Sequence, residues 1–161
     1  MTIGFILNGE DVVINADAEH RLIDIIREDF SLTGAKTGCF GGICGLCSVI
    51  LNGDIVKSCI IPALKIRGCE IITIEGFSMT DEYHDIVQGF HSAEVKNCGY
   101  CDTGKILTTE ALLIRNPRPS QRDILLAFSG IKCRCTDQAS LVKGVLAVAE
   151  NRQRRLYGRR S

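Results

Sequence analysis

The chain has 161 residues, and its 19 basic and 19 acidic side chains give a formal net charge of zero at pH 7. This balance gives no overall electrostatic preference for nucleic acid or for an anionic membrane surface. No apolar run approaches the roughly 18 residues of a membrane-spanning helix, and the first residues lack the basic region of a signal peptide. The nine cysteines, an odd number, indicate metal ligation rather than disulfides. We therefore expect a soluble, cytoplasmic protein.

Two β-hairpins are predicted in the first half of the chain. The dipeptide Asn-Gly between apolar runs favours a type I′ turn. It occurs twice, between residues 3–7 and 11–14 and between residues 48–51 and 55–58. Apolar residues recur at helical spacing in the segment from about 19 to 29, and a late strand follows at the segment 71–74. This order predicts a four- or five-stranded sheet packed on one helix, which is the β-grasp arrangement of plant-type ferredoxins.

After residue 81 the spacing of the apolar residues becomes helical. Helices are predicted over residues 85–92, residues 104–114, a segment that follows the N-cap Ser120, and residues 140–151. Four short helices indicate a compact four-helix bundle. The predicted fold class is therefore α+β, with a boundary between residues 76 and 84. We divide the chain into residues 1–78 and residues 79–161.

The first cysteine motif is a C-x4-C-x2-C pattern in a glycine-rich segment, residues 38–47. Cys39, Cys44 and Cys47 form the pattern, and Cys59 follows after the second hairpin. This is the ligand spacing of a plant-type [2Fe-2S] cluster. The segment holds four glycines in ten residues, which lets the backbone wrap closely and aim its N–H groups at the sulfur atoms.

A second cysteine motif lies in the helical half. Cys98 and Cys101 precede a predicted helix, and Cys133 and Cys135 lie in the loop between the third and fourth helices. Two cysteine pairs at helix ends can converge on one tetrathiolate site, where helix dipoles favour the thiolate. Zinc is the rival of a [2Fe-2S] cluster at such a site. The C-x-C spacing is tight for zinc and favours the cluster.

Taken together, the two motifs resemble the small iron–sulfur subunit of the xanthine oxidase family of molybdenum hydroxylases. The likeness runs from about residue 3 to residue 150 and includes all eight motif cysteines in order and spacing. It implies a β-grasp domain that holds an outer cluster and a four-helix domain that holds an inner cluster nearer the molybdenum. It also makes [2Fe-2S] the expected group at the second site.

The resemblance implies electron transfer, with no catalytic residue on this chain. Electrons would pass from a molybdopterin site on a large subunit through the inner and then the outer cluster to an FAD subunit. The assembly would be a heterotrimer or its dimer. The chain has no G-x-G motif, so a dinucleotide site is expected on a partner. A free-standing two-cluster carrier or redox regulator without molybdenum is the alternative function.

Several residues depart from the family pattern. Asn97 stands where the family has a glutamine that contacts the pterin, and its amide is one methylene shorter. Asp102, Asp137 and Gln138 also differ, and the two carboxylates are expected to lower the reduction potential of the inner cluster.

Two features fall outside both motifs. Cys69 is expected to be a small buried residue near the last strand. Five arginines among residues 152–160 are expected to form a solvated, frayed end, with a docking arm for an acidic partner as the alternative.

Overall fold

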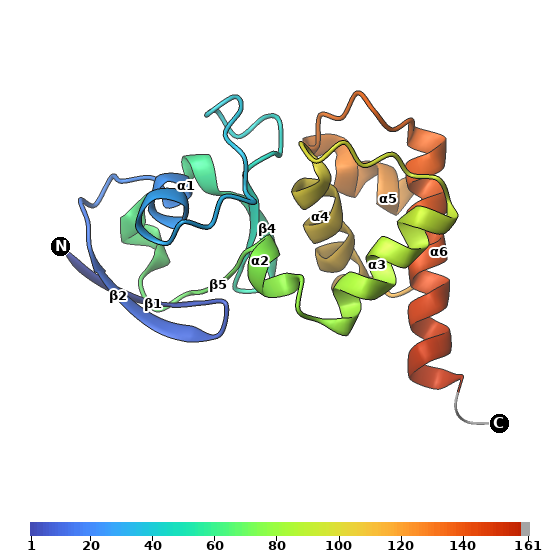
Figure 1. Ribbon diagram of the computed structural model, residues 1–161, viewed down its shortest axis with the longest axis horizontal. Coiled ribbons are helices and arrows are strands. Elements are labelled where there is room, and N and C mark those ends of the chain that lie inside the picture. Colours follow the sequence, from blue (N-terminus) through green and yellow to red (C-terminus); the bar gives the residue numbers. More distant parts are fainter. Residues whose placement is uncertain (159–161) are drawn as a thin grey trace.

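The computed structural model of the protein describes residues 1–158, and Figure 1 shows a sheet in the N-terminal half beside helices in the C-terminal half. No helix within residues 1–158 is long and apolar enough to span a membrane. The elements in chain order are β1 (Thr2–Leu7), β2 (Glu10–Asn15), α1 (Leu22–Asp24), the π-helix η1 (Ile25–Asp29), β3 (Ser48–Leu51), β4 (Asp54–Lys57), the 3-10 helices η2 (Ser58–Ile60) and η3 (Ala63–Ile66), β5 (Glu70–Ile72), α2 (Ile74–Phe77), α3 (Asp81–Ser92), α4 (Asp102–Arg115), α5 (Gln121–Ala127), the 3-10 helix η4 (Phe128–Gly130) and α6 (Gln138–Tyr157).

The two predicted hairpins are confirmed, and both turns have the expected backbone. β1 pairs antiparallel with β2, and β3 pairs antiparallel with β4. Asn8 and Gly9 have φ angles of 52° and 86°, and Asn52 and Gly53 have 50° and 85°. Positive φ at both central residues is the mark of a type I′ turn. The strand order β2-β1-β5-β3-β4 makes one mixed five-stranded sheet, because β1 and β5 are parallel.

One short helical segment packs on this sheet. It begins at Leu22 rather than near residue 19, because the backbone N–H of Leu22 donates to the carbonyl of Ile61 at 2.8 Å and ties the preceding chain to another segment. From α1 the chain continues directly into η1. The apolar side chains of this segment fill the first core and are fully buried: Leu22, Ile23, Ile25 and Ile26.

The late strand β5 is shorter than predicted. It ends before Thr73, although residues 71–74 were expected to be extended, and α2 begins directly afterwards. The backbone N–H of Thr73 donates to Oδ1 of Asn8 at 2.8 Å, and its hydroxyl donates to Glu75 at 2.7 Å. Side-chain acceptors therefore take the place of a neighbouring strand and end the ladder.

The four predicted helices of the second half are present, and α3, α4 and α6 are longer than predicted. Ser120 caps α5 as expected, in a capping box with Asp123. Thr80 caps α3 by accepting the N–H of Tyr83, and Asp137 caps α6 by accepting the N–H of Ser140 at 2.8 Å. These two caps explain the early starts of α3 and α6.

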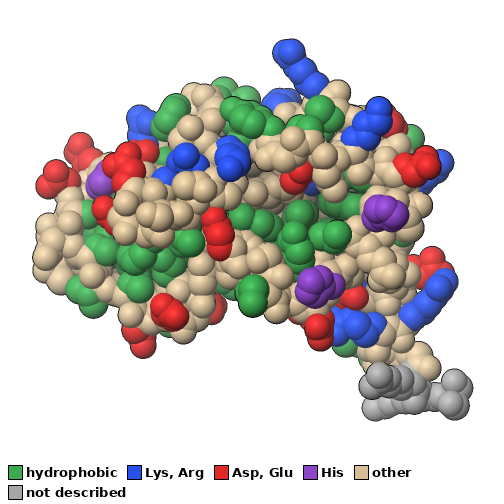
Figure 2. All heavy atoms as spheres, in the orientation of Figure 1, with side chains coloured by type: hydrophobic (Ala, Val, Ile, Leu, Met, Phe, Trp, Pro, Cys, Tyr) green, Lys and Arg blue, Asp and Glu red, His purple; other side chains and the backbone are tan. Residues whose placement is uncertain are grey.

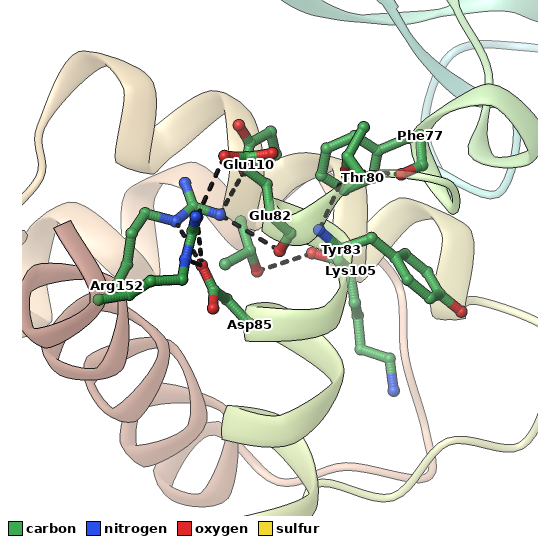
Figure 3. A network of polar contacts seen from close by, with 10 residues as sticks. Phe77, Thr80, Glu82, Tyr83, Asp85, Lys105, Glu110 and Arg152 are labelled. Atoms are coloured by element: carbon green, nitrogen blue, oxygen red, sulfur yellow. Dashed lines mark hydrogen bonds and ion pairs between the residues drawn. The ribbon is translucent and has the colours of Figure 1, made fainter.

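α6 also extends past residue 151, because carboxylates of α3 and α4 hold its arginines (Figure 3). Arg152 forms an ion pair with Glu110 at 2.7 Å, and these side chains are 11% and 8% exposed. Arg155 contacts Asp85 at 2.9 Å and Glu82 at 3.1 Å. The expectation of a frayed end is therefore wrong for these arginines, and the last two, at positions 159 and 160, lie outside the described residues.

The apolar residues form two cores, one beneath the sheet and one among the helices. β3 contributes to both, because successive strand residues point to opposite faces: Val49 belongs to the first core and Ile50 to the second. The helical half therefore packs against one face of the sheet. Figure 2 shows acidic and basic side chains interspersed on the visible surface, in agreement with the zero net charge.

Candidate metal centres

The first cysteine set lies in the loop before β3 and in the short helix η2. Cys47 directly precedes β3, Cys59 lies in η2, and both are buried. Ser58 links them, because its backbone N–H and its hydroxyl both donate to the carbonyl of Cys47, at 3.1 and 2.7 Å. Cys44 is partly exposed and Cys39 is exposed. The sheet thus fixes two thiols, and the glycine-rich loop carries the other two.

The backbone of this loop surrounds the sulfur of Cys39. The N–H groups of Gly41, Ile43 and Cys44 donate to Cys39 Sγ at 3.4, 3.3 and 3.4 Å. These bonds, with that of Gly41 foremost, lower the pKa of Cys39 to about 6. Backbone N–H groups aimed at a sulfur stabilise its thiolate form, which is the form that binds metal.

A lysine stands beside the buried thiols of this set. Burial raises the pKa of Cys59 to about 11, and the neighbouring Cys47 thiol adds to the rise. Lys57, on β4, donates to the hydroxyl of Ser48 at 3.1 Å. Burial lowers the pKa of Lys57, while Cys47, Cys44 and Cys59 act in the opposite direction. The ammonium of Lys57 is therefore close enough to offset negative charge on this set.

The second set brings together its four predicted residues. Cys101 is the N-cap of α4, and Cys133 and Cys135 lie in the loop between η4 and α6. The thiols form two contacting pairs, Cys98 with Cys135 and Cys101 with Cys133. All four line one cavity of about 260 Å³, together with Leu46, Tyr100, Lys132 and Arg134.

The carboxylate of Asp102 lies beside two of these thiols. A carboxylate oxygen of Asp102 and the sulfurs of Cys98 and Cys101 lie within 4.8 Å of one another. However, Oδ2 accepts the N–H of Gly99 at 2.7 Å, and Oδ1 lies 3.1 Å from Nζ of Lys105. The carboxylate is therefore engaged by the backbone and by a lysine, which leaves the four thiols as the ligand set.

This arrangement changes the expectation for the two unusual carboxylates. The charge of Asp102 is offset by Lys105, a fully buried side chain that our sequence interpretation overlooked. Asp137 is exposed and serves as the N-cap of α6, whose first residue is Gln138. Asp102 thus has a cation beside it and Asp137 accepts hydrogen bonds at a helix end, and their effect on the reduction potential of the inner cluster stays a prediction.

The two cysteine sets touch through backbone atoms. The N–H of Lys132 donates to the carbonyl of Cys44 at 2.9 Å, and Lys132 directly precedes Cys133. Gly45 has φ of +78°, and a Cβ there would lie 2.5 Å from the carbonyl oxygen of Gly130. In Figure 1 the loops that carry the two sets project on the same edge of the molecule. Only a glycine permits this approach, so the outer loop packs directly on the inner one.

The chemistry of both sets fits an iron–sulfur cluster. Each set offers four sulfur atoms, and soft thiolate ligands select iron–sulfur clusters, zinc or copper(I). In the outer set, N–H donors surround a sulfur, as the stabilisation of a negatively charged cluster requires. In the inner set, the four thiols line one common cavity.

Cys69 lies outside both sets. Its thiol donates to the carbonyl of Lys65 at 3.4 Å, just before β5. The residue is partly exposed, so the expectation that it is buried is wrong. It takes part in neither candidate centre.

Comparisons with known proteins agree with this arrangement. Residues 5–67 match the family of 2Fe-2S iron-sulfur cluster binding domains, and residues 73–146 match a [2Fe-2S] binding domain. The chain is 45% identical over 136 residues to the nicotinate dehydrogenase small FeS subunit of Eubacterium barkeri, covering 84% of this chain and 87% of that one. It is 34% identical over 140 residues to the nicotine 6-hydroxylase small subunit of Paenarthrobacter nicotinovorans, covering 87% and 84%.

A solved structure has the same fold. The crystal structure of quinoline 2-oxidoreductase from Pseudomonas putida 86 superposes with a TM-score of 0.83 and 33% identity, covering 96% of both chains. The match extends over both cysteine sets and over both halves of the molecule. The chain therefore belongs to the family of small iron–sulfur subunits of the molybdenum hydroxylases, the family that includes xanthine dehydrogenase.

Proposed function

We propose that this chain relays electrons as the small iron–sulfur subunit of a heteromeric molybdenum hydroxylase. Its ligands would be Cys39, Cys44, Cys47 and Cys59 for the outer cluster and Cys98, Cys101, Cys133 and Cys135 for the inner cluster. A bound [2Fe-2S] cluster accepts and releases one electron at a time. The residues of this chain hold the clusters, stabilise thiolate charge and set the distance between the two sites.

The contact between Lys132 and Cys44 carries this proposal. One hydrogen bond of 2.9 Å and one peptide unit separate an outer-set residue from Cys133 of the inner set. A protein that merely stored iron or used zinc for structure would not need such close sites. Two adjacent sites that each reach the surface suit a relay, since Cys39 is exposed at one end and Cys135 at the other.

The partners follow from the proposed assembly. We infer a large subunit with molybdopterin-bound molybdenum beside the inner set and an FAD subunit beside the outer set, in a heterotrimer or its dimer. Asn97 is exposed next to Cys98 and can offer its amide to the pterin. The substrate pocket would lie on the large subunit, so no residue of this chain is catalytic.

Nitrogen heterocycles are the first substrate class to test. The named relatives act on nicotinate, on isoquinoline and on nicotine, and the structural neighbour acts on quinoline. Xanthine, named for another relative, is also a nitrogen heterocycle, whereas the aldehyde named for the aldehyde oxidoreductase relative belongs to a different chemical class. We infer that the complete assembly hydroxylates a nitrogen-containing aromatic ring.

Finer features of the fold are part of the same proposal. The mixed sheet on one helix supports a β-grasp domain over residues 1–78, and helices α3 to α6 support a four-helix bundle over residues 79–161. The cytoplasmic location remains a prediction from the cysteine content.

The comparisons favour the subunit over a free-standing carrier. The relatives that match over most of their length are named as subunits of dehydrogenases, oxidoreductases and hydroxylases. The departures at Asn97 and Asp137, which prompted the alternative, lie at an exposed amide and at a helix cap.

Metal analysis of the native complex tests the function. The chain would be tagged and purified without oxygen together with whatever binds it. About four irons per chain, a large partner and about one molybdenum are expected. Zinc in place of iron, or iron without molybdenum and without a large partner, would contradict the proposal.

A further inference from the structure

Lys105 is an unusual residue for the position it occupies. It lies on α4 four residues after Cys101, and its side chain is completely buried. A buried ammonium group is costly unless its hydrogen bonds and its charge are satisfied. The acceptors that satisfy this ammonium group come from the segment just before Cys98 and from the segment just after Cys135.

The three protons of the ammonium group have three acceptors. Nζ of Lys105 donates to the carbonyl of Lys96 at 2.6 Å, to Oδ1 of Asn97 at 2.9 Å and to the hydroxyl of Thr136 at 3.3 Å. Thr136 completes the ring by donating to the same Lys96 carbonyl at 2.7 Å. One side chain thus ties the segment before Cys98 to the segment after Cys135.

The ammonium group also fixes the direction of the Asn97 amide. An ammonium only donates hydrogen bonds, so the oxygen of the amide must face Lys105. The NH2 group then faces away, and among residues 1–158 it has no acceptor. Asn97 is exposed, so this NH2 group is a free donor next to Cys98.

We propose that Lys105 is a positioning residue for the inner centre: it clamps the two cysteine segments together, fixes the direction of the Asn97 amide and places a positive charge beside the cluster. The inference rests on the proposed function, because it requires a cluster at the inner set. Asp102, whose Oδ1 lies 3.1 Å from Nζ, opposes that charge. The pair would tune the inner cluster without affecting the outer one.

The charge should be visible in the reduction potentials. A reduced cluster carries one more negative charge, so a nearby cation stabilises the reduced form. Lys105→Met removes the cation and should lower the ratio of reduced to oxidised inner cluster about tenfold at a fixed potential, because a unit charge so close to the ligand sulfurs is poorly screened by solvent. Asp102→Asn should raise the same ratio.

Anaerobic redox titration of the native complex by electron paramagnetic resonance makes the test, because it resolves the two clusters. The double variant Lys105→Met/Asp102→Asn removes both charges and should return the inner cluster close to the wild-type ratio. Lys65→Met, an exposed lysine of η3, is the matched control and should change neither cluster. Hydrogen exchange at Lys96, Asn97 and Thr136 should quicken in Lys105→Met, because the clamp is lost.

The possible outcomes separate the two proposals. An unchanged inner ratio in Lys105→Met, equal shifts at both clusters, or no recovery in the double variant would overturn the role of Lys105. If the Lys105→Met protein does not accumulate, Lys105→Gln, which is neutral but keeps hydrogen-bond donors, decides alone: a lowered ratio supports the role and an unchanged ratio refutes it. A wild-type complex without any inner-cluster signal would instead refute the proposed function.

Discussion

Arg152→Met should destabilise the protein strongly, because it leaves a carboxylate buried without its cation. Arg152 pairs with Glu110 at 2.7 Å, and both side chains are about nine-tenths buried at 11% and 8% exposure. Asp85 would keep Arg155 at 2.9 Å, whereas Glu110 has no second ion pair among residues 1–158. Removing one partner of a buried pair costs about 3–5 kcal/mol of unfolding free energy.

This loss should depend on pH in a defined direction. Burial raises the pKa of Glu110 above its ordinary value of 4.5. The folded state therefore disfavours the ionised form, and this cost develops as the pH rises from the ordinary pKa of 4.5 to the raised pKa of the folded state. Without Arg152 the cost of ionisation increases. The destabilisation should be greatest near pH 7 and should shrink as the pH falls through the raised pKa towards about 4.5, because Glu110 is then protonated in the folded state.

Urea unfolding of the cluster-loaded chain, followed by far-UV circular dichroism at both pH values, measures the effect. Arg154→Met is the matched control, because Arg154 lies on the same helix and pairs with Glu150 at the surface, where the side chains are 71% and 66% exposed. It should cost no more than about 0.5 kcal/mol. Equal losses for the two variants, or a loss in Arg152→Met that does not shrink in acid, would refute the reasoning.

Three further outcomes are expected. Gly45→Ala should displace the outer loop from the inner one, because its Cβ would lie 2.5 Å from a backbone oxygen. Metal analysis should then find bound iron reduced towards about two per chain. The control Gly53→Ala, where φ is a similar +85° but nothing lies within 4 Å, should keep its iron in the same assay. Lys57→Met should lower the reduced fraction of the outer cluster alone in a redox titration, and an effect on the inner cluster would contradict the placement of Lys57. Ser120→Ala should cost about 1 kcal/mol in urea unfolding through the lost cap of α5, and no measurable loss would show that the capping box is dispensable.

Most of the architecture could be predicted from local patterns. Asn-Gly turns fix both hairpins because two successive positive φ angles suit few other residues. Cysteine spacing identified the two sets because cysteines a few residues apart, as in each short motif, can reach the same cluster. The meeting of Cys101 with Cys133, far apart in the chain, depends on how the helices pack. Ser120 identified the start of α5, since its hydroxyl satisfies an N–H group at the helix end.

Other features depend on contacts between distant segments, and local patterns do not reveal them. β5 ends early because the side chain of Asn8 takes up the N–H of Thr73 from another part of the chain. α6 runs to Tyr157 because carboxylates from α3 and α4 hold its arginines. A lysine inside the apolar run of α4 was the available signal for Lys105, but its acceptors lie on two other segments.

The hydrogen bond from Lys132 to Cys44 couples the backbone of the two cysteine loops, so loss of a cluster from one site should affect the order of the other. It uses main-chain atoms only, so any residue except proline at position 132 can supply it. If the outer site lost a bound cluster, Cys44 would no longer be held by iron, and the backbone of Lys132, next to Cys133, would be hydrogen-bonded to a looser loop. Loss of one cluster should therefore loosen, without emptying, the other site.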